Sequence, residues 1–135
     1  MVDIITCLND SMPKIIKHTT VIDFPMYGCK VSIIITDNLK QVVNNIYKKY
    51  KMTEVFEDDA EGVVITPDID NYHLVIDTKY LSHNTIAHEI YHATVRVTED
   101  RDIVDEETQA WVAGHIASVM YKFLDKKNLT IKYGS

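Results

Sequence analysis

Two histidines and a glutamate near the middle of the chain have a spacing suited to metal chemistry, in His88-Glu89-Ile90-Tyr91-His92. Residues four apart lie one above the other on a helix, so both imidazoles can bind one ion. Glu89 lies about 100° around the helix from His88, where it can take a proton from a metal-bound water rather than bind the metal. The pattern predicts a zinc site at His88 and His92, with Glu89 as general base.

The neighbouring residues predict a helix from about Asn84 to Val97, with Asn84 or Ser82 as the N-cap. Both histidines fall on the side roughly opposite an apolar stripe, where a ligand can approach. Four residues within about 60° of one another form this core-facing stripe: Ile86, Ile90, Ala93 and Val97. The pattern alone leaves open a surface helix with two ordinary histidines.

Catalytic zinc usually takes three protein ligands and one water, so the motif leaves one protein ligand to find. The metzincin pattern has its third histidine six residues after the second, and Thr98 stands there, which excludes that class. A carboxylate on the next helix is the other common solution. Glu107 is the preferred candidate and Glu106 the second. Both also suit a first helical turn, because acidic side chains there favour the helix dipole.

The preference for Glu107 rests on a helical wheel. Trp111, Gly114 and Ser118 stay within about 40° of Glu107, whereas Glu106 is rotated by about 100°. Gly114 would permit close approach between the two helices, so this face is expected to meet the motif helix.

Other polar side chains have weaker assignments. His115 is either an oxyanion stabiliser or a half-buried helix histidine, and Tyr91 is an alternative for the electrophilic role. His73 and His83 have no partner spacing and are expected at the surface. Three acids are candidate hydrogen-bond partners of the ligand imidazoles: Asp100, Asp102 and Asp105.

Composition indicates one domain spanning residues 1–135, with 46% apolar and 25% charged residues. No apolar run approaches the length of a membrane span and no signal peptide is evident, which favours a cytoplasmic protein, in the host cytoplasm if phage-encoded. A net charge of −6 with few clustered lysines argues against a nucleic-acid partner. Cys7 and Cys29 lack the spacing of a zinc-thiolate site and are expected to be reduced.

The order of the elements predicts an α+β fold. Strands are expected at 19–24, 29–36, 62–66 and 72–77, the first two as a hairpin and the third ending at Pro67. Asp37 is expected to cap a helix that presents apolar residues from Leu39 to Tyr50. Residues 1–18 suggest a short helix or irregular lead, the acidic residues from Glu54 to Glu61 a solvated loop, and residues 103–124 a long helix.

Two blocks of sequence, Ile86-Ala87-His88-Glu89-Ile90-Tyr91-His92-Ala93 and Glu106-Glu107-Thr108-Gln109-Ala110-Trp111-Val112-Ala113-Gly114, resemble the small phage- and bacteria-encoded metallopeptidases of the gluzincin type. The resemblance implies a minimal zincin-like fold, in which a small mixed sheet of about four strands packs on the active-site helix and a long C-terminal helix follows. It also implies zinc held by His88, His92 and Glu107, with Glu89 as base, and a peptide substrate that pairs with an edge strand at 72–77.

These observations predict a zinc metallopeptidase that hydrolyses peptide bonds of a peptide or protein substrate. One alternative is a non-catalytic interaction module with a structural metal or none, and another is a zinc hydrolase acting on a non-protein amide or ester. The sequence does not determine the oligomeric state.

Overall fold

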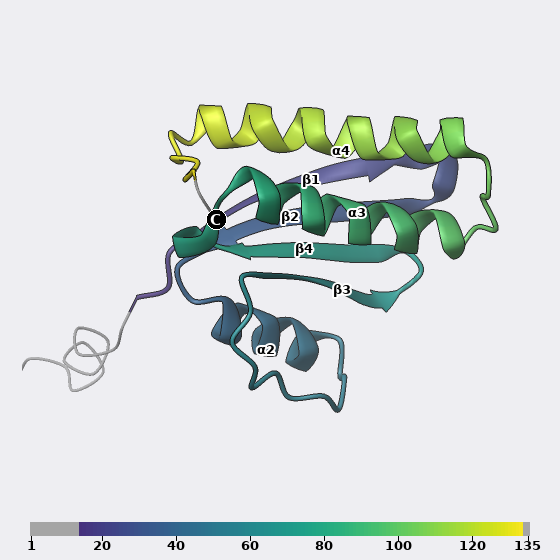
Figure 1. Ribbon diagram of the computed structural model, residues 1–135. Coiled ribbons are helices and arrows are strands. Elements are labelled where there is room, and N and C mark those ends of the chain that lie inside the picture. Colours follow the sequence, from purple (N-terminus) through teal and green to yellow (C-terminus); the bar gives the residue numbers. More distant parts are fainter. Residues whose placement is uncertain (1–13, 134–135) are drawn as a thin grey trace, which may run out of the picture.

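The computed structural model describes residues 14–133, which form a mixed four-stranded sheet with helices on both faces (Figure 1). The α+β class and the layout predicted from sequence are confirmed, including the long last helix. The predicted N-terminal lead lies largely outside the described residues. In chain order the elements are β1 (Lys17–Phe24), η1 (Pro25–Tyr27), β2 (Cys29–Thr36), α2 (Leu39–Lys49), β3 (Gly62–Asp68), β4 (Asn71–Asp77), η2 (Thr78–Tyr80), α3 (His83–Glu99) and α4 (Glu106–Lys126).

The sheet has the order β1-β2-β4-β3, with β2 and β4 parallel and the two outer pairs antiparallel. The predicted hairpin of β1 and β2 is confirmed, and Gly28 closes it at a φ of 67°, a conformation that favours glycine. The expectation that 72–77 is an edge strand is wrong, because β4 lies between β2 and β3. Nearly all of β4 is buried, as expected for a strand covered on both faces.

The edge strand on this side is β3, which continues through Pro67 to Asp68 instead of ending at the proline. Its register with β4 shifts between Ile65 and Asp68. An edge strand tolerates proline because the missing N–H is not needed by a neighbouring strand.

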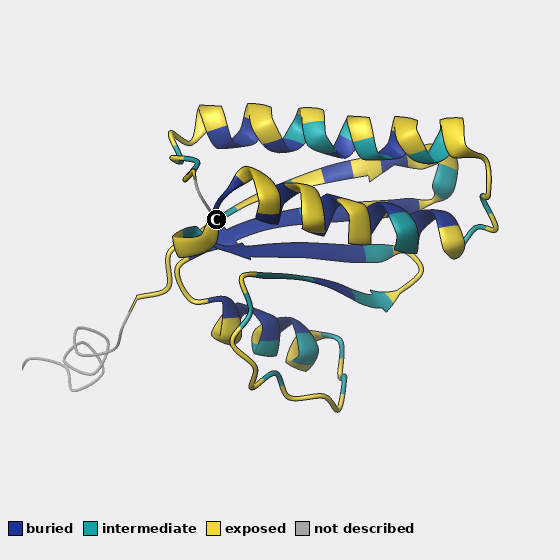
Figure 2. Ribbon diagram, in the orientation of Figure 1, coloured by how far each residue is buried: buried dark blue, intermediate teal, exposed yellow. Residues whose placement is uncertain are grey.

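Helices α3 and α4 cover one face of the sheet and α2 covers part of the other (Figures 1 and 2). The apolar stripe predicted for α3 is confirmed, since all four of its residues are buried in the larger core. Helix α2 buries its own stripe against Val75 of β4 and Ile65 of β3. Four residues make up that stripe: Leu39, Val42, Val43 and Ile46. In residues 14–133 no helix has the length and apolar character that crossing a membrane requires.

Side-chain caps set where the helices begin. Ser82 Oγ accepts from the Thr85 N–H at 3.1 Å, so α3 begins at His83. Asp105 Oδ2 accepts from the Thr108 N–H at 2.9 Å and starts α4. The predicted cap of α2 is wrong by one residue, since Asn38 is the N-cap. The Asp37 carboxylate instead accepts from the Ile16 N–H at the start of β1.

His73 of β4 is buried, which corrects the expectation that it lies at the surface. Only 8% of its side chain is exposed, beneath α2. Its Nε2 lies 3.3 Å from Tyr50 Oη, and its Nδ1 has no hydrogen-bond partner among the described residues. Burial lowers the His73 pKa and the nearby Lys49 ammonium lowers it further, against an opposing effect of Asp68, so folding favours the neutral imidazole.

We therefore expect acid to destabilise the parent more than a His73→Phe variant. Below about pH 6.5 the unfolded chain binds a proton at His73 that the folded chain does not, so folding free energy is lost as the pH falls. The loss is about 1.4 kcal/mol for each unit by which the native pKa lies below the unfolded value. Urea unfolding between pH 7.5 and 5 should show that the free energy of unfolding of the parent falls relative to that of the variant below pH 6.5. A difference between the two free energies of unfolding that does not change with pH would contradict a lowered His73 pKa.

Candidate metal centre

His88 and His92 are exposed on α3, and their rings lie close together. Their Nε2 atoms lie 3.1 Å apart, with the rings nearly perpendicular at 79°. Two imidazoles on one tetrahedral zinc, each about 2.0–2.1 Å from the ion, would place these nitrogens about 3.3–3.4 Å apart. The pair therefore fits zinc with a shift of a few tenths of an ångström. Burial of the opposite stripe of α3 explains why both rings face outward.

The His92 pKa is lowered, first by partial desolvation and then by the neighbouring His88 and Arg96. A neutral imidazole is the form that binds a metal ion. The Arg96 guanidinium lies one turn beyond His92 and donates to the Val64 carbonyl and to Thr66 Oγ1 of β3. It thereby fixes this end of α3 to the edge of the sheet.

Glu89 lies on the side of α3 that faces the start of β3 and is buried, with 5% of its surface exposed. Its carboxyl group packs against Gly62, the first residue of β3. Burial raises the Glu89 pKa, the nearby Glu61 raises it further, and His88 and Arg96 oppose the shift. A carboxyl group with a raised pKa is suited to accept a proton from water and to return it later in a reaction.

A hollow of about 320 Å³ opens beside this group and is lined by Glu61, Gly62, Asn84, Thr85, His88 and Glu89. Glu61 Oε2 accepts from Thr85 Oγ1 at 3.1 Å, which holds a second carboxylate at the rim. Glu61 was expected in a solvated loop and not at this rim. Its position directly before Gly62 and a strand was the only signal that could have indicated it.

Glu107 lies apart from the two imidazoles. It is exposed at the start of α4 and lines a separate hollow with Met26, Tyr27, Thr108 and Trp111. The Trp111 ring packs edge-on to Phe24 of β1, at 6.4 Å between centroids. The face of α4 that carries Glu107 and Trp111 therefore lies over the β1–β2 hairpin, contrary to the expectation that it meets α3.

The close helix approach expected at Gly114 is also wrong. A Cβ atom added there would meet nothing within 4 Å. The alternative ligand, Glu106, is exposed in the first turn of α4. Within residues 14–133 no three His, Cys, Asp or Glu side chains gather closely enough to hold a metal ion. Within residues 14–133 the candidate centre therefore consists of the His88 and His92 imidazoles without a third ligand.

The remaining candidate side chains each lie beside the ring of another residue. His115 stacks on Trp111 and packs edge-on against Phe24, which places it over β1. Tyr91 is 67% exposed, and its ring centroid lies 6.4 Å from that of His92. His83 is exposed as expected, and its Nδ1 lies 2.8 Å from Tyr121 Oη.

The acids considered as partners of the imidazoles lie between α3 and α4. Asp105 caps α4, and its pKa is lowered by the hydrogen bonds from Thr108. Asp100 accepts from Tyr72 Oη, to which Arg101 also donates at 2.8 Å. Asp102 is exposed after the end of α3, where φ is 55°.

Gly62→Ala is expected to displace Glu89 and to lower any activity that depends on it. A Cβ atom at position 62 would lie 2.8 Å from Glu89 Cγ and 3.1 Å from Oε2, closer than van der Waals contact allows. We expect a loss of roughly 10²-fold in turnover, as for a small misplacement of a reacting group. Gly114→Ala is the matched control, because its site is open. Equal activity of the two variants in a hydrolysis assay would contradict the packing argument.

Comparisons with protein-family models, curated proteins and solved structures found no match to this chain.

Proposed function

We propose that this protein is a zinc-dependent peptidase acting from the face of α3 that carries His88, Glu89 and His92. The observation that carries the proposal is the 3.1 Å separation of the two Nε2 atoms, which fits two ligands of one zinc ion. The buried Glu89 carboxyl beside them supplies a proton acceptor. We further propose that the protein is cytoplasmic and that its substrate is a peptide or a protein.

Each residue has a defined part in the proposed reaction. His88 and His92 would hold the ion, and a zinc ion bound there would supply Lewis acidity toward a water and a peptide carbonyl. Glu89 removes a proton from the attacking water and returns it to the nitrogen of the leaving amine. Gly62 and the hydrogen bond between Glu61 and Thr85 fix the wall against which Glu89 lies.

The substrate is proposed to be an extended peptide that lies along β3. This strand is the sheet edge beside the hollow, and its first residue contacts Glu89. A peptide paired with β3 would place its backbone beside α3 and its scissile carbonyl near the imidazoles. The edge-strand role implied by the resemblance is thus reassigned from β4 to β3.

Incubation of the zinc-loaded protein with a mixture of unstructured peptides, followed by mass spectrometry, tests the function. New termini should form with zinc, disappear with a chelator and return on zinc addition. Cleavage that survives chelation would contradict the proposal, and so would its absence from a verified zinc-loaded protein across a broad peptide mixture.

A non-catalytic interaction module is the second candidate, and one observation favours it. Within residues 14–133 only two side chains converge on the centre. The two functions predict different behaviour of bound metal, because a structural site is closed whereas a catalytic site keeps a position for water. Binding of small inhibitory chelators such as hydroxamates to the zinc-loaded protein would support the peptidase.

A further inference from the structure

Strand β1 forms the sheet edge farthest from the candidate metal centre. In the order β1-β2-β4-β3, no described strand lies beyond it. It is eight residues long, and its middle residues, Thr19 to Ile22, are uncharged and β-branched. Long edge strands of this composition readily pair with another chain unless they are protected.

The register identifies which backbone groups of β1 are free. The Asp37 N–H donates to the Ile16 carbonyl at 3.1 Å, and Lys17 lies opposite Thr36. In an antiparallel pair, residues that bond to the partner alternate with residues that point away from it. Even-numbered residues such as His18 and Thr20 therefore bond to β2. The N–H and C=O groups of Lys17, Thr19 and Val21 point outward from the sheet.

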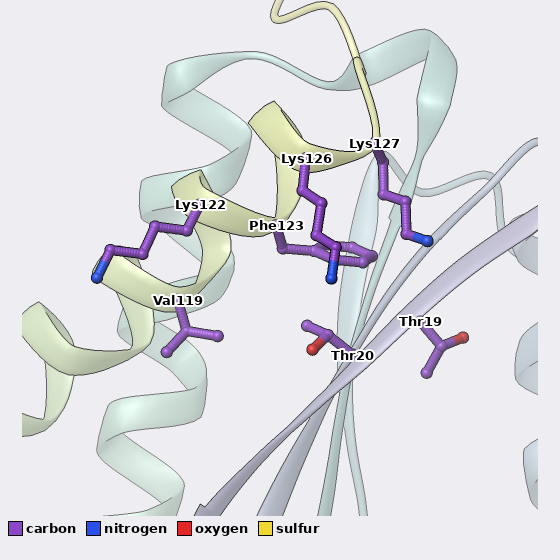
Figure 3. A pocket seen from close by; sticks show the side chains of 7 residues that line it. All are labelled: Thr19, Thr20, Val119, Lys122, Phe123, Lys126 and Lys127. Carbon is purple, nitrogen blue, oxygen red and sulfur yellow. The ribbon is translucent and has the colours of Figure 1, made fainter.

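A hollow of about 310 Å³ lies beside this edge, between β1 and the end of α4 (Figure 3). Val119 and Phe123 form its apolar part, and the hydroxyl residues Thr19 and Thr20 come from β1. Its charged residues are all cationic and come from α4 and its C-cap: Lys122, Lys126 and Lys127. In Figure 3 Lys126 and Lys127 extend toward β1, whereas Lys122 points away from the two threonines.

We propose that the β1 edge binds an extended acidic peptide segment of a partner protein by strand addition. The outward groups of Lys17, Thr19 and Val21 would supply the backbone pairing. Val119 and Phe123 would contact apolar side chains of the added strand, and Lys126 and Lys127 would pair with its carboxylates. The rest of the chain is acidic, with a net charge of −6, so this basic edge is a local exception.

Charge distinguishes this occupant from two others. A second copy pairing antiparallel through β1 would bring two lysine clusters together, and like charges across such an interface oppose association. A nucleic acid would need more cations than three lysines on an acidic chain supply. The proposed site lies at the edge opposite β3 and does not depend on the proposed peptidase function.

Fluorescence anisotropy tests the inference with a labelled peptide, Thr-Glu-Thr-Val-Thr-Glu-Thr-Val-Thr, whose glutamates and valines share one face of an extended strand. The assay uses the full-length Glu89→Gln protein with a chelator present, so that the peptide is not cleaved. The acidic peptide should bind and a version with lysine at each glutamate should not. N-methylation of alternate amides should abolish binding in one set of positions and spare it in the other, because only one side of an added strand faces β1.

The Lys126→Glu/Lys127→Glu double variant should weaken binding roughly tenfold. Lys40→Glu/Lys48→Glu is the matched control, since these exposed lysines of α2 line no hollow with β1, and it should leave binding unchanged. Equal effects of the two pairs, equal binding of both N-methylated peptides, or absence of binding would overturn the proposal. It would also be overturned by tighter binding of a single-stranded oligonucleotide, or by a parent dimer that Val21→Pro converts to monomer.

Discussion

Replacing Glu89 with Gln is expected to lower peptide hydrolysis roughly 10²- to 10⁴-fold, the range that general acid–base catalysis contributes. The amide keeps the shape of the side chain against Gly62 but cannot accept the proton of the attacking water. Zinc should stay bound, because the Glu89 side chain packs against Gly62 of β3 and is not one of the two proposed zinc ligands. The loss should therefore appear in turnover and not in metal content.

Initial rates on one cleavable peptide, measured at saturating zinc with parallel elemental analysis, check this expectation. Glu107→Gln is the matched control, because this acid lies in a different hollow and should behave as the parent. Parental rates from the Glu89→Gln protein would show that another group acts as base. Loss of zinc together with activity would show instead that Glu89 binds the metal.

His88→Ala and His92→Ala should each weaken zinc binding more than about 100-fold, the upper end of the cost of losing an outer hydrogen-bond partner of a ligand. The geometry requires both rings, since the site is defined by their two converging Nε2 atoms. Loss of either leaves one imidazole on an exposed helix face, where water competes for the ion.

Competition titrations with a zinc-chelating dye measure these affinities. His83→Ala is the control on the same helix, because His83 is exposed and contacts Tyr121. It should retain parental affinity. Similar losses in all three variants would indicate a general effect on the helix, and parental affinity in both site variants would place the metal elsewhere.

Local chemistry made much of this fold predictable. The apolar stripe of α3, the Ser82 cap and the hairpin between β1 and β2 each depend on residues close together in sequence. The outward position of His88 and His92 follows from burial of the opposite stripe. These features need only the period of a helix or strand and the chemistry of its ends.

The parts that sequence missed depend on how elements meet. A helical wheel places Glu107 and Trp111 on one face, but tertiary packing decides that this face covers β1 rather than α3. A glycine in sequence does not reveal its neighbour, so close approach was expected at Gly114 and occurs at Gly62. The burial of His73 and the internal position of β4 likewise follow from the strand order. Strand β4 pairs with β2, although α2 and β3 separate these two strands in the sequence.

X-ray absorption spectroscopy of the zinc-loaded protein tests the central claim most directly, because it reports the atoms bound to the ion. We expect nitrogen or oxygen ligands at about 2.0–2.1 Å from the ion, with the longer-range scattering of two imidazoles. That scattering should fall to one imidazole in His92→Ala at saturating zinc. Sulfur at about 2.3 Å, or a spectrum unchanged by the substitution, would contradict a zinc site at His88 and His92.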